Sequence, residues 1–216
     1  GTGPLEERYP LSAAQRSSLE MDGGSVHAAI AADGARLLVG AISLTALASI
    51  PPTQEFDLTG PDPGPNEWEL GSTLGYAYGP YTMAFNLSGF QLLDPADQPL
   101  GPPVPITLDM TDQAASADGR FIAMGRQPGL VDLYGSTGEL LATLDMELDS
   151  PGDGSLVLPS LSDDGDYVAA TTAPGTTAVW STATLERLDH LPNGGGRLVG
   201  DHLVRRVARG LEILDP

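Results

Sequence analysis

A short pattern, in which a glycine-containing turn joins two runs of apolar residues, recurs five times along this chain of 216 residues. The turn glycines are Gly34, Gly79, Gly119, Gly165 and Gly200, so successive turns are 45, 40, 46 and 35 residues apart. A repeat of this length is one supersecondary unit, which buries its apolar face only by stacking on its neighbours. The chain is therefore predicted to be a repeat protein.

The clearest unit consists of three apolar runs, Ser116–Gly125, Gly129–Tyr134 and Thr137–Leu144, which are separated by turns that contain glycine. Runs of this length between glycine turns are typical of short antiparallel strands, and no long segment has the 3.6-residue period of an amphipathic helix. The Asp118-Gly119 pair suits a type I′ turn, because both of its central positions have positive φ. We therefore expect an all-β fold built from meanders.

The same order of parts recurs on both sides of this unit. The next copy consists of Ser162–Gly165, Tyr167–Ala170, Thr176–Trp180 and Leu185–Leu188. The other predicted strands are Arg36–Val39, Tyr81–Phe85, Gly89–Asp94, His202–Val204 and Leu211–Leu214. Four short strands in about 40 to 45 residues are the content of one blade of a β-propeller.

The pattern S-x-D-G-x-x-[IV]-A, followed by [VL]-x-[LV]-[WY] and T-x-x-L-x-x-L, resembles the WD-repeat and related bacterial propeller families. The best matches are Ser116–Leu144 and Ser160–Leu188. The resemblance implies a β-propeller of about five four-stranded blades. The Gly-His dipeptide of the family is missing, and Ser181 follows Trp180 where the family has Asp. The buried His-to-Asp network of typical members is therefore not expected.

Ring closure is the next expectation. Leu211–Leu214 corresponds to the third strand of its unit, and Ser18–Met21 resembles Thr143–Met146, the fourth strand of the third unit. In a propeller, an N-terminal strand commonly completes the last blade and removes an exposed sheet edge. We predict that residues 17–21 close the ring, that residues 17–216 form the propeller domain, and that residues 1–16 are a leading segment or linker.

One long surface loop is also expected. The proline-rich stretch Pro51–Pro65 is predicted to be such a loop, and it contains the outer strand of the first blade near Glu55–Leu58.

Charge and composition exclude several partners. With 29 acidic residues against 10 arginines and no lysine, the formal net charge is -19, so a nucleic-acid partner is not expected. The longest weakly polar run, Leu37–Ile50, is shorter than the roughly 20 apolar residues of a membrane-spanning helix. Cysteine is absent, which excludes disulfides and thiol nucleophiles and leaves the compartment undetermined. Arginine without lysine is typical of GC-rich bacterial genes.

Metal and cofactor sites are not indicated. His27, His190 and His202 lie in different units and lack a partner at ligand spacing. The acidic turns Asp149–Asp153 and Asp163–Asp166 lack the distal glutamate of a calcium loop, which favours plain hairpin turns. No phosphate-binding or dinucleotide motif and no nucleophile elbow is present. We expect neither metal nor cofactor.

Candidate binding residues come from two segments. Trp68, Tyr76, Tyr78 and Tyr81 lie within 14 residues, and aromatic side chains are enriched at binding patches. The alternative is that such residues pack between blades, as Trp68 and Tyr81 are expected to do. The group of Arg205, Arg206 and Arg209 contacts an anion or neutralises nearby acids, and we favour neutralisation. The predicted binding residues are Trp68, Tyr76, Tyr78, Arg205 and Arg206.

The function follows from the resemblance, since the loops of a propeller and not its architecture decide what it binds. Similar bacterial propellers imply a non-catalytic protein-interaction or ligand-sensing module within a larger signalling or surface protein. Its partner is then a protein or small ligand on one propeller face. The alternative is a carbohydrate-active five-bladed propeller, either lectin or glycosidase. A glycosidase would need two carboxylates about 5 to 9 Å apart beside an aromatic platform.

Overall fold

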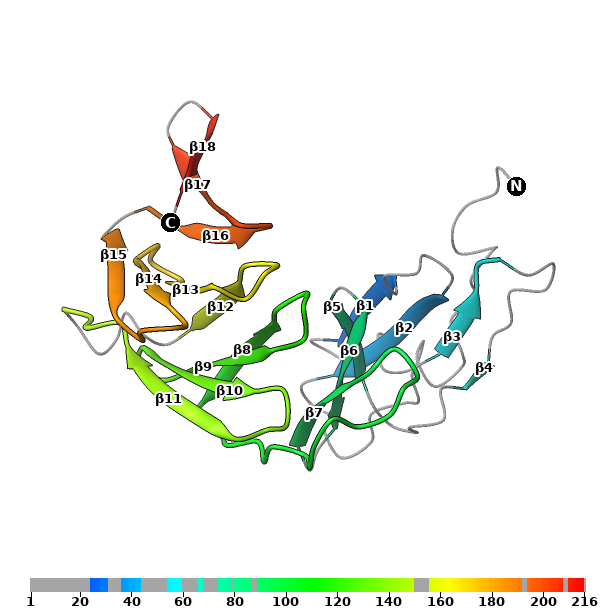
Figure 1. Cartoon of the computed structure of the whole chain (residues 1–216). Helices are drawn as coiled ribbons and strands as arrows, with labels where there is room; N and C mark the ends of the chain where they lie inside the picture. Colours follow the sequence, from blue (N-terminus) through cyan, green and yellow to red (C-terminus); the bar gives the residue numbers. More distant parts are fainter. Residues whose placement is uncertain are drawn as a thin grey trace. The chain divides into compact units, whose positions relative to one another are not determined.

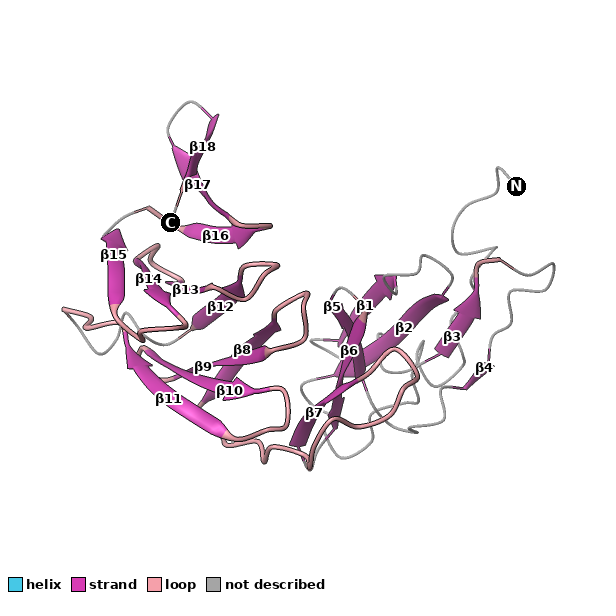
Figure 2. Cartoon of the chain, viewed as in Figure 1, coloured by secondary structure: helices cyan, strands magenta, loops and turns pink. Residues whose placement is uncertain are grey.

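The chain folds into strands that pair with their sequence neighbours in antiparallel sheets (Figure 1, Figure 2). The computed structural model describes residues 24–30, 36–43, 54–59, 66–67, 74–78, 80–86, 89–149, 156–191, 194–207 and 210–215. Within these ranges there are 18 strands and no helix, so the all-β prediction is confirmed. The chain divides into two compact units, residues 1–99 with 103–105 and residues 100–102 with 106–216.

The first unit contains two sheets. The first sheet consists of β1 (Gly24–Ile30), β2 (Arg36–Ser43), β3 (Gln54–Asp57) and β4 (Asn66–Glu67), in that order. The second sheet consists of β5 (Leu74–Tyr78), β6 (Tyr81–Asn86) and β7 (Gly89–Leu93). The strand expected near Glu55–Leu58 is therefore β3, the third of its sheet, and the short β4 is the outermost strand.

The second sheet has three strands where four were expected. In the fourth position, Val104 forms an isolated bridge to Phe90, with N···O distances of 3.0 and 2.7 Å. The surrounding segment contains Pro99, Pro102, Pro103 and Pro105, which have no backbone N–H to donate. A proline-rich segment cannot sustain a ladder of backbone hydrogen bonds, so pairing stops at single bridges.

The second unit contains three sheets, stacked one against the next (Figure 1). The third sheet consists of β8 (Met110–Ala115), β9 (Phe121–Arg126), β10 (Leu130–Gly135) and β11 (Leu140–Asp145). The fourth sheet consists of β12 (Val157–Leu161), β13 (Tyr167–Thr172), β14 (Thr177–Ser181) and β15 (Arg187–Leu191). The last sheet consists of β16 (Gly196–Val199), β17 (His202–Val207) and β18 (Gly210–Leu214).

The three predicted turn glycines that fall within the described residues lie where the repeat predicts them. Gly119, Gly165 and Gly200 join the first two strands of their sheets and have φ values of 74°, 71° and 59°. Gly34 and Gly79 fall outside the described residues, although the strands on either side of them pair with each other. The type I′ turn expected at Asp118-Gly119 is wrong, because Gly119 N–H donates to Ser116 O (3.1 Å) and only the glycine has positive φ. This is a type I turn that ends in a left-handed glycine.

The Ser-x-Asp-Gly pattern recurs because its side chains build the turn. In the third sheet, Ser116 Oγ donates to Asp118 Oδ1 (2.6 Å) and accepts the N–H of Phe121 (3.1 Å). In the fourth sheet, Ser162 Oγ donates to Asp164 Oδ1 (2.7 Å) and accepts the N–H of Tyr167 (3.0 Å). Both hairpins thereby satisfy buried polar groups locally, and each serine is fully buried.

Two apolar layers hold the second unit together. The layer between the third and fourth sheets contains Val131, Leu133, Met146, Val168 and Trp180. A smaller layer between the fourth and last sheets contains Ala169, Val179, Leu198 and Leu203. Strand alternation explains the division, because neighbouring residues of β13, such as Val168 and Ala169, point to opposite faces. No helix long and apolar enough to cross a bilayer is found in the described part of the chain.

Candidate functional site

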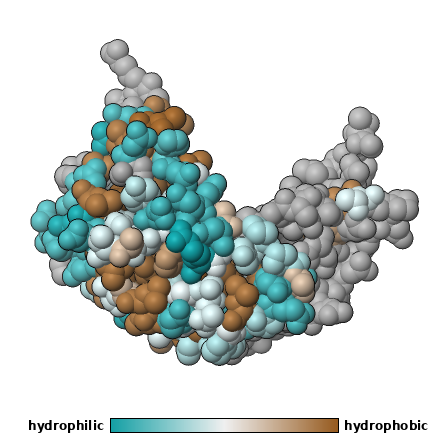
Figure 3. All heavy atoms as spheres, in the orientation of Figure 1, coloured by the Kyte–Doolittle hydropathy of each residue, from teal (hydrophilic) through white to brown (hydrophobic). Residues whose placement is uncertain are grey.

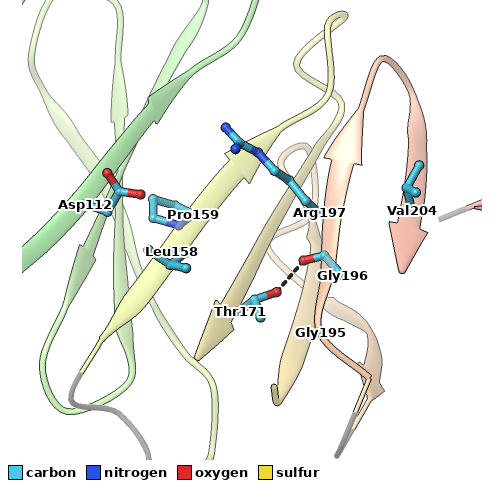
Figure 4. A pocket seen from close by; sticks show the side chains of 8 residues that line it. All are labelled: Asp112, Leu158, Pro159, Thr171, Gly195, Gly196, Arg197 and Val204. Carbon is cyan, nitrogen blue, oxygen red and sulfur yellow. Dashed lines mark hydrogen bonds between the residues drawn. The ribbon is translucent and has the colours of Figure 1, made fainter. Parts of the chain in front are cut away.

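A groove of about 420 Å³ lies along the first strands of the three sheets in the second unit (Figure 4). Its lining residues are Asp112, Leu158, Pro159, Thr171, Gly195, Gly196, Arg197 and Val204. Strands β8, β12 and β16 are edge strands of their sheets, so their outer sides are free of ladder partners within the sheet. Pro159 is compatible with this position because it has no N–H to donate.

Side-chain hydrogen bonds between sheets fix the walls of the groove. Thr111 Oγ1 donates to Val157 O (2.7 Å) and accepts the N–H of Val157 (3.1 Å), which ties β8 to β12. Ser160 Oγ accepts the N–H of Leu198 (3.0 Å), which ties β12 to β16. The three strands are therefore held in register with one another, and the groove is preformed.

Close backbone packing adds to these ties. A Cβ atom on Gly125 would lie 2.2 Å from Val157 O, so β9 approaches β12 more closely than any side chain permits. At the next sheet, Thr171 Oγ1 donates to Gly196 O and Thr177 Oγ1 accepts the N–H of Gly196 (2.9 Å). Glycine at position 125 therefore lets the third and fourth sheets meet closely beside the groove.

The groove combines an apolar floor with opposite charges. Leu158 and Val204 contribute apolar surface, and 39% of Leu158 is exposed. Figure 4 shows Arg197 extending from β16 toward β12, with Asp112 on the far side of Pro159. A concave surface with apolar walls and a few placed polar groups is the usual composition of a ligand site.

Arg197 differs from the other arginines whose side chains the structure describes. Arg120, Arg126, Arg187 and Arg205 each form an ion pair with at least one carboxylate. Arg197 is exposed and forms no ion pair with any residue in the described ranges. A guanidinium that lines a groove and pairs with none of the described carboxylates is available to an incoming anion.

A second cluster of charges lies in the third sheet and is satisfied internally. The Arg126 guanidinium pairs with Asp132 (2.7 Å) and Asp109 (2.9 Å), and Thr143 Oγ1 donates to Asp132 (2.6 Å). Hydrogen bonds from Thr107 and then Arg126 lower the pKa of Asp109, and burial followed by the Asp132 charge raises the pKa of Tyr134. The charged groups of this cluster pair with one another, which indicates a structural role.

The predicted binding residues fall in both units. Trp68 lies outside the described residues, and Tyr76 and Tyr78 belong to β5 of the first unit, where only their backbone is described. Arg205 pairs with Glu212 (2.6 Å), while for Arg206 only the backbone of β17 is described. Binding by these residues stays a prediction, and Arg205, the one among them whose side chain is described, is not one of the residues that line the groove.

Sequence reasoning missed Asp112, Leu158 and Arg197. The sequence did hold a usable signal. Each of these three residues precedes a hairpin glycine on the first strand of its unit, and the first strands of propeller blades surround the central channel. Arg197 also directly follows the glycine run Gly194–Gly196. Across the described ranges, no three His, Asp or Glu side chains are grouped to hold a metal ion.

Comparisons with known proteins show which known fold the structure resembles. Neither protein-family models nor curated proteins match the sequence. Among solved structures, the β-propeller domain of Cps50 (Swd1) from Myceliophteria thermophila superposes with a TM-score of 0.57 at 12% identity. The match covers 85% of this chain and 67% of that domain. The antiparallel sheets thus resemble the blades of a WD40 propeller, as the sequence pattern predicted.

Proposed function

We propose that this protein is a non-catalytic interaction module that binds a peptide segment of a partner protein in the groove of β8, β12 and β16. The observation that carries the proposal is the preformed groove, whose floor is apolar and whose sides hold Arg197 and Asp112. WD40-like propellers generally serve as protein-interaction scaffolds, which supports the same class of function. A place within a larger bacterial signalling or surface protein is part of this proposal.

The groove volume supports a peptide-sized ligand. A space of about 420 Å³ falls within the range of about 300 to 1,000 Å³ that is usual for ligand pockets. Exposed Leu158 and part-exposed Val204 offer apolar surface that an incoming side chain would remove from water. Each buried apolar side chain contributes about 1.5 to 3 kcal/mol.

The carbohydrate-active alternative finds less support at this groove. Asp112 is the one carboxylate among the lining residues, and no aromatic side chain is among them. Glycoside hydrolysis uses two carboxylates, and lectins commonly stack sugars on aromatic rings. The net charge of -19 likewise favours protein partners over nucleic acid.

A five-bladed ring that residues 17–21 close is also proposed here. It is a proposal because residues 17–21 lie outside the described residues. If residues 17–21 complete the last sheet, they bury Leu19 and Met21, so deleting residues 1–21 should lower the melting temperature, whereas deleting residues 1–12 should change it little. Equal melting temperatures for the two deletions would refute closure by residues 17–21.

The proposed groove is tested with random peptides displayed on phage and selected on the full chain. Selected peptides should lose binding to Leu158→Asp, which places a charge on the groove floor. The matched control is Leu140→Asp. Leu140 is also an exposed leucine on a strand, but it lies on β11 and is not among the residues that line the groove. Retained binding to Leu158→Asp, or failure to select any peptide, would contradict the proposed function.

A further inference from the structure

Arg197 gives the groove a preference for one kind of ligand. Four of the five arginine side chains that the structure describes are paired with carboxylates, and Arg197 is the exception. An arginine side chain carries its charge at every physiological pH, so this positive charge is permanent. We propose that Arg197 is the specificity-determining residue of the groove and that it binds a carboxylate of the partner peptide; this inference rests on the proposed function.

The geometry supports a carboxylate next to an apolar side chain. Arg197 and Val204 are direct cross-strand partners on β16 and β17, so their side chains lie on the same face of the last sheet. Leu158 stands on the neighbouring strand β12 and lines the same groove. A guanidinium presents a planar fork that matches a carboxylate with two parallel hydrogen bonds. The ligand is therefore a peptide with Asp, Glu or its terminal carboxylate beside an apolar residue.

The charge of the whole chain defines the rest of the partner. A net charge of -19 repels strongly acidic molecules at long range and attracts basic ones. Phosphate recognition commonly uses several arginines, whereas a single described arginine lines this groove. Asp112 adds a negative charge at the far side of the groove. These features favour a neutral or basic partner segment that carries one carboxylate, and they disfavour phosphopeptides.

The peptide selection described above tests this inference when it is repeated on two variants. Peptides selected on the wild-type chain should be enriched in Asp or Glu beside an apolar residue. Arg197→Gln should lose that enrichment, because glutamine has no charge. Arg187→Gln is the matched control, since Arg187 lies on β15, pairs with Glu147 and does not line the groove. Thermal melting of both variants should match the wild-type chain.

A synthetic peptide from the wild-type selection measures the contact directly. Replacing its acidic residue with Gln or Asn should weaken binding to the wild-type chain by about tenfold or more, as expected for a charged hydrogen bond. The same replacement should leave the affinity for Arg197→Gln nearly unchanged. Phosphoserine in that position should bind no better than the carboxylate.

Each contrary result has a defined meaning. Peptides without acidic enrichment that still lose binding to Leu158→Asp would overturn the role of Arg197 and leave the proposed groove intact. If replacing the acidic residue of the peptide weakens binding to the wild-type chain and to Arg197→Gln equally, the role of Arg197 is also overturned and the groove is left intact. Tighter binding of phosphoserine would replace the carboxylate by a phosphate ligand. Peptides that bind Leu158→Asp normally would overturn the proposed function and this inference together.

Discussion

The fourth and last sheets share one design but differ in how much of it is covered. Both begin with an edge strand, turn through a positive-φ glycine and continue antiparallel. Val179 pairs with Ala169 in the fourth sheet, and Ile213 pairs with Val204 at the same register position in the last sheet. Val179 is fully buried, whereas 67% of Ile213 is exposed.

Burial of the position therefore depends on the neighbouring sheet and not on the residue. Val179 is covered by Leu198 and Leu203 of the last sheet, while the corresponding face of β18 exposes both Leu211 and Ile213. The hydrophobic effect acts only on surface removed from water, so identical patterns contribute differently in the two sheets. A repeat unit of this kind is stabilised mainly by its neighbours.

The largest loss of stability is expected when the aromatic side chain of the fourth sheet is removed. Trp180 is buried in the layer between the third and fourth sheets, and Leu214 is its register equivalent in the last sheet. Trp180→Ala should lower the free energy of unfolding by about 3–5 kcal/mol, because it leaves a large cavity. Leu214→Ala, which changes a half-buried side chain, should cost about 1–2 kcal/mol. Urea unfolding of both variants checks the difference, and similar losses would contradict it.

A smaller effect is expected at the pair that defines the comparison. Val179→Ala removes two buried methyl groups and should destabilise the chain by about 1.5–3 kcal/mol. Ile213→Ala should change stability by no more than about 0.5 kcal/mol, as is usual for exposed positions. A substantial loss for Ile213→Ala would show that this face of β18 is covered in solution.

The hairpins offer a third test, because the fourth sheet has the Ser162 network and the last sheet has Val199 in place of that serine. Ser162→Ala removes the bond to Asp164 and leaves the N–H of Tyr167 without its acceptor, so stability should fall by about 1–2 kcal/mol. Val199 occupies the corresponding place before the shorter Gly200-Asp201 turn. Val199→Ala should be nearly neutral in thermal and urea unfolding. A neutral Ser162→Ala would refute the importance of the network.

The smallest effect concerns acid. Hydrogen bonds from the N–H of Asp166 and then from Ser162 Oγ lower the pKa of Asp164. The unfolded chain therefore binds this proton more readily, and the resulting stabilisation is complete above about pH 4 and is lost as the pH falls through the lowered pKa. Because Asp164 is exposed, solvent screens the effect and keeps it modest.

Asp164→Asn keeps the acceptor oxygen and removes the titration. The wild-type chain should have a higher free energy of unfolding than this variant at pH 5, and the difference should shrink toward pH 3 as the Asp164 carboxylate is protonated. Urea unfolding at a series of pH values measures this difference. A constant difference across the series would contradict the stabilising role of the Asp164 carboxylate.

Much of the fold followed from local patterns. The hairpins at Gly119, Gly165 and Gly200 were predicted because positive φ restricts the residues that a tight turn accepts. Some boundaries shifted: the strand expected at Leu185–Leu188 is β15, Arg187–Leu191, because Leu185 lies in the turn with a φ of 60°. A leucine in a left-handed turn has no local sequence signal, so a pattern of apolar residues alone misplaces such a strand.

By itself, the sequence determined the repeat, the strand content and the turn positions, since these depend on residues close together along the chain. Tertiary structure alone decided which faces are buried and which charges meet. Asp112, Leu158 and Arg197 form one groove although they are separated by up to 85 positions, and Arg205 pairs with Glu212 while Arg197 pairs with none of the described carboxylates. The physical reason is that stacking brings the first strands of successive sheets together, and no local propensity encodes contacts across that distance.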